Sequence, residues 1–310
     1  MTQVTVLMST YNGELYIREQ LDSILTQANV TIKLLIRDDG SKDNTPLILE
    51  EYKNKYPNII YVIKGKNIGY AASFSELVRC ALGTDYPIVS EWFAFADQDD
   101  VWNNDKINHA LQYINKNIPS TTPILYCSNT ELVDENLNHI GYAWKKNNVS
   151  ISKENCLIES FATGCTMVFN RMLAELFISH YKSSYPAAHD YFIYQLALFC
   201  GCCFWDPTSF IKYRQHGNNC IGMTTPIGKL KRKFSGKAKR KKNFLESQAQ
   251  SFLELAHDVI GEDDQEIITN FINYRKNFLS KLKLIFNNRF RYSSPDMNVM
   301  FWIRILRGIL

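Results

Sequence analysis

Short apolar runs alternate with amphipathic segments along the first two thirds of the chain. The runs Val4–Met8, Ile32–Ile36, Ile59–Ile63, Trp92–Ala96 and Ile124–Cys127 predict buried β-strands. Between them, apolar residues at helical spacing predict helices: one carrying Leu15, Leu21, Ile24 and Leu25, then Thr45–Tyr56, Tyr70–Leu82 and Asp105–Ile114. Thr45, followed by a proline, is the expected N-cap of the second of these helices. Strands that alternate with helices predict an α/β fold, with a Rossmann-like, mostly parallel sheet covered by helices.

The pattern changes near residue 220. Two long helical patterns follow, Asn243–Ile260 and Asp264–Phe286, and the chain ends in the apolar and basic segment Met297–Leu310. We therefore expect an α/β catalytic domain over residues 1–220 and a basic helical C-terminal extension over residues 221–310. The apolar stretch Tyr191–Trp205 is shorter than the roughly 20 residues that span a bilayer, so it predicts a core helix.

Charge is distributed unevenly between these two parts. Residues 1–220 hold 18 Lys and Arg against 23 Asp and Glu, whereas residues 221–310 hold 17 against 8. Nine of the basic residues lie in Lys229–Lys242, which contains no acidic residue. A basic appendage indicates an anionic partner, either a membrane surface or nucleic acid. The run has only Phe234 as an interleaved aromatic residue, which argues against a nucleic-acid-binding protein.

The cysteines and the N-terminus point to a reducing compartment. The eight cysteines show no CxxC spacing, so a zinc ribbon is not expected. Several lie in apolar runs, where a free thiol acts as a small hydrophobic group. The first residues lack the charged and apolar regions of a signal peptide. We expect a cytoplasmic location.

Carboxylates gather directly after the run that ends at Ala96. Asp97, Asp99 and Asp100 fall within four residues, where like charges repel and raise one another's pKa. A divalent cation removes this conflict, and hard oxygen ligands suit Mg²⁺ or Mn²⁺. Polar loops also follow the first strand, at Ser9–Gly13, and the second strand, at Asp38–Ser41. In a parallel sheet these loops open onto one edge, which is where α/β sheets bind ligands.

The combination of these motifs resembles the family 2 glycosyltransferases of the GT-A fold. Ser-Thr-Tyr-Asn follows the first strand, Asp-Asp-Gly-Ser the second, Asn-Ile-Gly the third and Asp-Gln-Asp-Asp the fourth. Further matches are Thr163–Thr166, His189–Tyr191 and Arg214–Asn219. The resemblance covers about residues 3–220. The forms Asp-Gln-Asp-Asp-Val-Trp at 97–102 and Arg-Gln-His-Gly-Asn-Asn at 214–219 resemble the bacterial rhamnosyltransferase branch. No G-x-G-x-x-G or P-loop motif is present, which excludes dinucleotide-binding oxidoreductases and P-loop NTPases.

The resemblance implies a role for each matching residue. The nucleotide-sugar donor would be bound by Thr10, Tyr11, Asp39, Asp97 and Trp102. Among these, Tyr11 would stack on the base, Asp39 would accept the N3–H of uracil or thymine, and Trp102 would line the sugar pocket. Asp99 and His216 would hold the metal, and Gly164 and His189 would shape the acceptor side. Asp190 would be the catalytic base, with a pKa kept low by a helix N-terminus.

The resemblance implies an inverting, metal-dependent transferase. The expected donor is dTDP-L-rhamnose, and the expected acceptor is a saccharide or lipid-linked saccharide of a cell-surface polysaccharide. A UDP-hexose or UDP-N-acetylhexosamine donor is the alternative. The C-terminal extension is expected to hold the enzyme at the inner face of a membrane without spanning it, through the cations of Lys229–Lys242 and an interfacial helix over Met297–Leu310 that includes Trp302. Alternatively, Met297–Leu310 packs on residues 243–286 or forms a homodimer interface.

Overall fold

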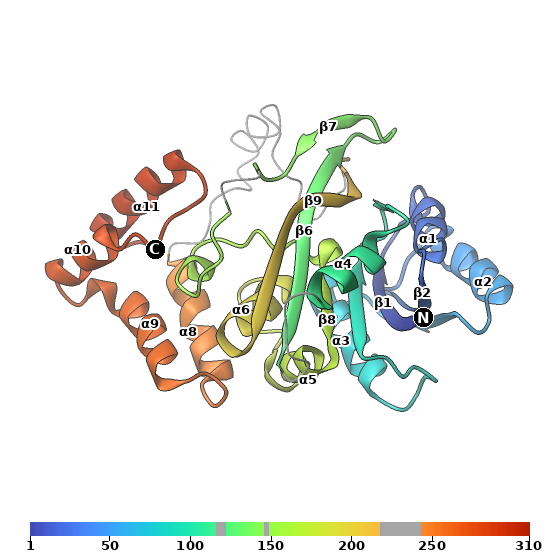
Figure 1. Ribbon diagram of the computed structural model, residues 1–310, viewed down its shortest axis with the longest axis horizontal. Coiled ribbons are helices and arrows are strands. Elements are labelled where there is room, and N and C mark those ends of the chain that lie inside the picture. Colours follow the sequence, from blue (N-terminus) through green and yellow to red (C-terminus); the bar gives the residue numbers. More distant parts are fainter. Residues whose placement is uncertain (116–121, 146–148, 218–242) are drawn as a thin grey trace.

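The computed structural model describes residues 1–115, 122–145, 149–217 and 243–310. Figure 1 shows a central twisted sheet with helices on both faces and a group of helices at one end. The order of neighbouring strands is β3-β2-β1-β4-β8-β6-β9-β5, and β7 pairs with β6 outside this path. The expected α/β architecture is therefore confirmed.

The first half of the sheet is parallel, as the alternation of strands and helices predicts. Its strands are β1 (Thr2–Thr10), β2 (Val30–Asp38), β3 (Ile60–Lys64) and β4 (Trp92–Ala96), and its connecting helices are α1 (Ile17–Leu25), α2 (Thr45–Lys55) and α3 (Tyr70–Leu82). β1 lies between β2 and β4, with Val6 beside Leu34 and Ala94. The carboxyl ends of β1, β2 and β4 consequently meet at one edge.

The second half of the sheet mixes directions. Its elements are β5 (Val101–Trp102), α4 (Lys106–Asn115), β6 (Ile124–Val133), β7 (His139–Tyr142), β8 (Val168–Asn170), α5 (Arg171–His180), α6 (His189–Cys200) and β9 (Cys202–Arg214). The short strand β8 is antiparallel to both β4 and β6, whereas β6 and β9 run parallel. Because β9 runs in the same direction as β6 and β4, its carboxyl end carries Arg214 to the edge where β4 ends.

Side chains that alternate along the central strands build two apolar layers. Leu7 and Phe93 contribute to the layer under α3, α5 and α6, while Val6 and Ala94 contribute to the layer under α1, α2 and α4. Adjacent residues of a strand point to opposite faces, so each strand serves both layers. Leu15, which the helical pattern placed on the core face of the first helix, is 74% exposed and lies before α1 begins.

Two other local expectations are corrected. The helix predicted over Tyr191–Trp205 ends at Cys200, and the chain continues as β9. A Cβ at Gly201 would lie 2.0 Å from the carbonyl oxygen of Pro123, so only glycine permits this close crossing. The N-cap of α2 is Asn44 and not Thr45; the Thr45 hydroxyl accepts a hydrogen bond from the backbone N–H of Gly13 instead (2.8 Å).

The C-terminal helices pack onto the α/β part. They are α8 (Phe244–Ala256), α9 (Glu262–Ile272), α10 (Phe278–Phe286) and α11 (Pro295–Arg307). The ring of Phe252 in α8 lies 5.5 Å from that of Phe192 and 5.4 Å from that of Phe199, both in α6. Phe301 and Ile305 of α11 are buried in the same apolar layer. Packing of the last segment on residues 243–286 is thus observed: the backbone N–H of Leu310 donates to the hydroxyl of Tyr274 (3.0 Å).

Some of the remaining expectations concern residues that the structure does not describe. The basic run Lys229–Lys242 and the domain boundary near residue 220 lie outside the described residues. Among the helices of the described ranges, none combines the length and the apolar character needed to cross a bilayer. Seven cysteines belong to the described residues, and all seven are free thiols.

Candidate active site

The three polar loops predicted at the strand ends lie together. The backbone N–H of Tyr11 donates to Oε1 of Gln98 (2.8 Å), and Nε2 of Gln98 donates to the carbonyl of Tyr11 (3.1 Å). The backbone N–H of Asn12 donates to the hydroxyl of Ser41 (2.9 Å). These bonds join the loops after β1, β2 and β4 into one surface. Tyr11 is 42% exposed, whereas Thr10 is buried and hydrogen-bonded to Asp38.

Asp39 anchors the loop that follows β3. Its Oδ1 accepts hydrogen bonds from Arg37 and from the backbone N–H of Ile68 (2.9 Å), and its Oδ2 accepts one from the N–H of Gly69 (2.9 Å). A carboxylate offers about four acceptor positions, so one remains for a ligand donor. Arg37 and Asp39 are both almost fully buried. The structure thus shows Arg37 as the partner of Asp39.

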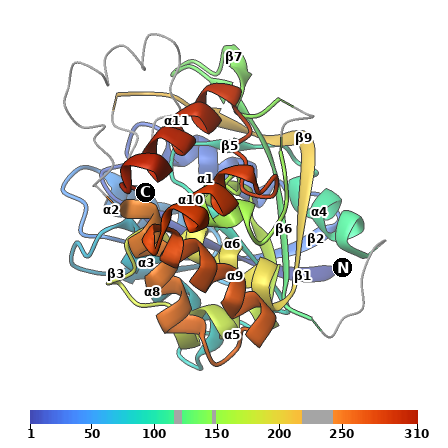
Figure 2. The same cartoon turned by 90° about the vertical axis from the view of Figure 1, so that its left-hand side faces the viewer.

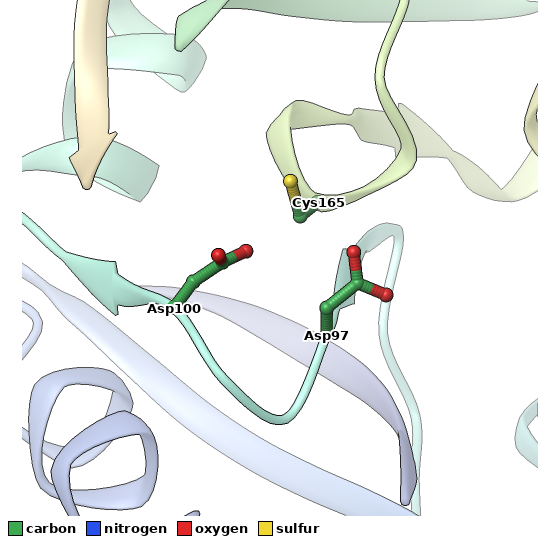
Figure 3. Close-up of side chains that lie close together, drawn as sticks. All are labelled: Asp97, Asp100 and Cys165. Carbon is green, nitrogen blue, oxygen red and sulfur yellow. The ribbon is translucent and has the colours of Figure 1, made fainter. Parts of the chain in front are cut away.

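Two of the carboxylates after β4 face a cysteine. Asp97 and Asp100 point toward Cys165 in Figure 3, and the ligand atoms of the three residues lie within 4.8 Å of one another. Burial, then the neighbouring Asp99, raises the pKa of Asp97 to about 7 and that of Asp100 well above its usual range. Within the described ranges, the Oδ2 of Asp100 has no hydrogen-bond partner. This set could hold a divalent cation, and Cys165 is a member that sequence reasoning did not single out.

Asp99 and His216 form the second candidate metal set. Nε2 of His216 lies 2.8 Å from Oδ2 of Asp99, although the two residues are far apart in the sequence. The imidazole packs on the ring of Tyr16, with 4.9 Å between centroids. Both side chains keep some exposure, 9% for His216 and 16% for Asp99. The carboxylate oxygen of Asp99 suits Mg²⁺ or Mn²⁺, and His216 would add an imidazole nitrogen to the ligand set.

Lys106 distinguishes the two metal sets. Its Nζ is buried, has no hydrogen-bond partner among the described residues and lies 3.6 Å from the ring centroid of Trp102. Burial lowers the pKa of Lys106 to about 7, and the neighbouring Cys165 and Asp100 oppose that shift. Beside Asp100 and Cys165, the fraction of Lys106 that is protonated at neutral pH supplies positive charge to that set. The Asp99 carboxylate faces His216 instead, where a bound cation would supply the positive charge.

Trp102 does not lie where the sequence placed it. The side chain is 3% exposed and packs between Lys106 and the apolar layer that includes Ile107 and Ile211. Its backbone N–H donates to the hydroxyl of Ser23 (3.1 Å). The structure therefore does not bring Trp102 to an open sugar pocket. An aromatic residue in a strand two positions after the carboxylates is here part of the core.

Arg214 ties the carboxylate loop to three other elements. Its Nε donates to the backbone carbonyl of Asp99 (2.9 Å), and its guanidinium also bonds Glu19 of α1 and the carbonyl of Glu135. Its own backbone N–H donates to Oδ1 of Asp100 (3.2 Å). Arg214 is 2% exposed. In the sequence, Arg214 stands out only as part of a motif. The signal that could have identified its role is its position as a basic residue at the end of a long strand.

Asp190 lies in the first turn of α6, whose N-cap is Ala188. Its Oδ1 accepts from the N–H of Tyr191 (2.8 Å) and its Oδ2 from the N–H of Gly164 (3.3 Å). The pKa was expected to be low because of the helix N-terminus. Burial instead raises the pKa of Asp190 to about 6, and the hydrogen bonds offset only part of that effect. At neutral pH the group is mostly ionised and able to accept a proton.

His189 and Gly164 support Asp190 in different ways. The imidazole of His189 is 3% exposed and stacks on Phe74, with 4.2 Å between ring centroids. Burial lowers the pKa of His189 to about 3, so the ring is neutral. In the part of the chain that the structure describes, neither ring nitrogen has a hydrogen-bond partner. His189 is thus a core residue behind the site, while Gly164 reaches the site through its backbone N–H.

Asp190 and the carboxylates after β4 share one site. Asp190 contributes to the raised pKa of Asp97, which places the two groups near each other. A parallel half-sheet with clustered loops, an acidic strand end, and a helix that opens with a carboxylate define a GT-A glycosyltransferase. The family model described as "Glycosyl transferase family 2" matches residues 5–177, and the chain belongs to this family.

Curated relatives carry the same kind of name. The dTDP-rhamnosyl transferase RfbG of Shigella flexneri is 33% identical over 228 residues, covering 69% of this chain and 73% of that protein. The uncharacterized glycosyltransferase RT0329 of Rickettsia typhi is 29% identical over 219 residues, covering 69% of this chain and 64% of that protein. The chain is therefore similar to a rhamnosyltransferase over most of its length.

Solved structures confirm the fold. Staphylococcus aureus TarS 1–349 in complex with UDP superposes with a TM-score of 0.55 at 16% identity, covering 98% of this chain and 79% of that one. GalNAc-T7 with UDP, GalNAc and Mn²⁺ gives a TM-score of 0.56 at 13% identity, covering 89% of this chain and 57% of that one. At such low identity these similarities concern the architecture and not the substrate.

Proposed function

We propose that this family 2 glycosyltransferase transfers L-rhamnose from dTDP-L-rhamnose, with inversion, to a saccharide or lipid-linked saccharide in cell-surface polysaccharide synthesis. The observation that carries the donor is the 33% identity to a dTDP-rhamnosyl transferase over 69% of the chain. UDP-hexoses and UDP-N-acetylhexosamines are the alternative donors. We favour them less, because the UDP-bound solved structures resemble this chain only at the level of the fold, which does not indicate a shared donor.

The donor is proposed to lie across the loops at the strand ends. Tyr11 offers an exposed ring for the base, and Asp39 keeps one acceptor position beside the loop at Ile68 and Gly69. Thr10, through its hydrogen bond to Asp38, positions the loop that carries Asp39. Asp97 is proposed to face both the donor and Asp190, whose charge acts on it. These contacts would orient the anomeric carbon of the sugar toward Asp190.

Asp99 and His216 are proposed to hold Mg²⁺ or Mn²⁺. When bound, such a cation neutralises charge on the departing nucleoside diphosphate. Arg214 fixes the backbone of Asp99, and Tyr16 fixes the plane of the His216 ring. The two donor atoms are therefore held near each other before any ligand arrives.

Asp190 is proposed to remove the proton of the acceptor hydroxyl. As the hydroxyl oxygen forms its bond to the anomeric carbon, the bond from that carbon to the diphosphate oxygen breaks with its electron pair. The proton passes to the Asp190 carboxylate, and the nucleoside diphosphate leaves from the opposite face, which inverts the configuration. The N–H groups of Gly164 and Tyr191 hold the two carboxylate oxygens in place.

A donor screen tests the proposal. Purified full-length protein is incubated with Mn²⁺ or Mg²⁺ and a panel containing dTDP-L-rhamnose, UDP-glucose, UDP-galactose and UDP-N-acetylglucosamine. Release of nucleoside diphosphate and competition binding are measured for each. We expect dTDP-L-rhamnose to bind most tightly and to be consumed fastest. Tighter binding of a UDP-sugar would transfer the proposal to the alternative donor class.

A further inference from the structure

Exposed large apolar side chains are concentrated at the C-terminal end of the chain. Nineteen large hydrophobic residues are exposed among those that the structure describes, and eight of them lie between residues 278 and 306. These eight are Phe278, Leu279, Phe286, Met297, Val299, Met300, Ile303 and Leu306. All belong to α10 and α11, so these two helices carry a concentration of unburied apolar surface that calls for a partner.

Three of the exposed residues of α11 form a helical stripe. On α11, Val299, Ile303 and Leu306 are spaced by four and three residues, which places them on one side of the helix. Phe301 and Ile305 occupy the other side and are buried. The helix thus has a core side and an outward side, both apolar.

The helix α10 repeats this arrangement next to α11. Leu279, Lys283 and Phe286 share an exposed side, while Leu284 is buried. Nζ of Lys281 donates to the backbone carbonyl of Leu306 (2.9 Å) and joins the two helices. In Figure 2 α10 and α11 lie side by side on the end of the molecule that faces the viewer. We call the eight exposed apolar residues of α10 and α11 the C-terminal face.

The segment that carries the C-terminal face is almost entirely positive in charge. Residues 273–310 contain eight Lys and Arg and a single acidic residue, Asp296. Some of these cations are used within the protein, as in the ion pairs Arg275–Glu246 and Arg289–Glu154. Others remain at the surface of the same helical segment, namely Lys276, Lys283 and Arg307. Apolar residues and cations therefore occupy the same end of the molecule.

We propose that the C-terminal face docks on an anionic lipid bilayer, with its apolar side chains at the boundary between headgroups and acyl chains. Exposed Lys and Arg beside them would meet the lipid phosphates. A second copy of the chain is a poorer occupant, because it would bring two cationic faces together. The inference rests on the proposed function in one respect: a lipid-linked acceptor would be presented at such a membrane surface.

The structure changes which residues carry this contact. The terminal segment Met297–Leu310 was expected to bind as a whole, including Trp302. Phe301, Ile305 and Leu310 instead face the core, and Trp302 is half-buried, with Arg291 over its ring at 5.3 Å. The exposed residues of α10, which the sequence did not assign to the contact, take their place.

Vesicle flotation of the full-length protein tests the docking. Vesicles of phosphatidylcholine alone are compared with vesicles that also contain phosphatidylglycerol, at low salt. The apolar variant Leu279→Ser/Phe286→Ser/Ile303→Ser keeps every charge, including the run Lys229–Lys242. The charge variant is Lys276→Glu/Lys283→Glu/Arg307→Glu. The matched control Leu47→Ser/Val89→Ser removes side chains that are 71% and 79% exposed at other places on the surface.

We expect the wild type and the control to float with anionic vesicles and much less with neutral ones. The apolar variant and the charge variant should each lose roughly tenfold or more in the fraction bound. Circular dichroism should show unchanged folding, because the replaced side chains are exposed.

Two results would overturn the inference. If the apolar variant floats like the wild type, the C-terminal face is not the lipid contact. If the wild type ignores anionic vesicles, and light scattering finds a dimer that the apolar variant converts to a monomer, the face belongs to a second copy. Flotation uses no nucleotide sugar and the donor screen uses no vesicles, so failure of one leaves the other interpretable.

Discussion

Asp190 is subject to two opposing influences. Backbone N–H groups of Gly164 and Tyr191 favour its charged form, whereas burial favours the neutral form and is the larger effect. The resulting pKa of about 6 suits a general base that must be ionised at neutral pH and still accept a proton in the transition state.

Replacing Asp190 with Asn preserves its size but removes its ability to accept a proton. We expect Asp190→Asn to lower kcat by about 10²- to 10⁴-fold while donor binding is retained. In the wild type, kcat/KM should fall as the pH drops below about 6, because the protonated carboxyl cannot act as a base. Steady-state rates across pH and calorimetric donor binding check this. Near-normal transfer by Asp190→Asn would remove the residue from the chemistry.

The two carboxylate sets can be separated by their response to metal. We expect Asp99→Ala to abolish transfer and to weaken Mn²⁺ binding strongly, because the Asp99–His216 pair loses its oxygen donor. Cys165→Ser is the matched test of the other set, and it should leave Mn²⁺ affinity nearly unchanged. Mn²⁺ binding followed by electron paramagnetic resonance measures both. If Cys165→Ser loses the metal and Asp99→Ala keeps it, the assignment is reversed. Full turnover in excess EDTA would contradict metal dependence altogether.

At the scale of elements, β9 explains much of the site. It pairs in parallel with β6 and, near its end, antiparallel with β5, which delivers Arg214 and then His216 to the loop after β4. Arg214 bonds the backbone of Asp99 and the carboxylate of Glu19 at the same time. A fork-shaped guanidinium suits this task, because lysine offers only a point charge. The path of β9 thus sets the geometry of the metal pair.

The sequence predicts elements whose signals are local. The helix expected over Tyr70–Leu82 coincides with α3, because its apolar spacing and its flanking glycines, Gly69 and Gly83, lie within it or beside it. The end of α6 at Cys200 was missed, because it depends on the distant carbonyl of Pro123. The antiparallel placement of β8 between β4 and β6 was also missed, because a short apolar run does not indicate which strands will be its neighbours.

In the candidate site, too, the sequence predicts features with a local pattern and misses those that depend on distant segments. The carboxylates after β4 are visible as a cluster in the sequence, and their strand-end position follows from the apolar run before them. The approach of His216 to Asp99 was expected only through resemblance to a family. The raised pKa of Asp190 and the burial of Trp102 depend on packing by segments far along the chain, which a local pattern does not contain.

The crossing at Gly201 gives a prediction at this scale. Gly201→Ala would place a methyl group against the backbone of Pro123, which cannot move without disturbing the pairing of β6 and β9. We expect a loss of about 3 kcal/mol in the free energy of unfolding. Gly141→Ala is the control, because no atom of the described residues lies within 4 Å of a Cβ there. Chemical denaturation of both variants checks this, and equal stability would show that the crossing tolerates a side chain.

At the scale of the whole molecule, the site and the C-terminal face belong to one packed body. α6 begins at the proposed base and contacts α8 through Phe192, Phe199 and Phe252. Asn155 donates to the carbonyl of Arg291 (2.5 Å), and Glu154 pairs with Arg289, so the connection continues beyond α9. Docking through α10 and α11 would therefore orient Asp190 relative to the membrane.

This shared core bears on the predicted division into residues 1–220 and 221–310. Two independent domains would unfold separately, whereas a common apolar layer predicts one cooperative transition. The ring of Phe252 is fully buried against α6, so Phe252→Ala should cost about 3–5 kcal/mol and lower the Tm of the whole transition. Leu279→Ser, which changes an exposed residue of the same extension, should leave the Tm nearly unchanged. Scanning calorimetry with a simultaneous assay of donor binding measures both quantities. If the wild type shows two transitions, and Phe252→Ala shifts only the one that leaves donor binding intact, the extension is a separate domain and the common core does not govern its stability.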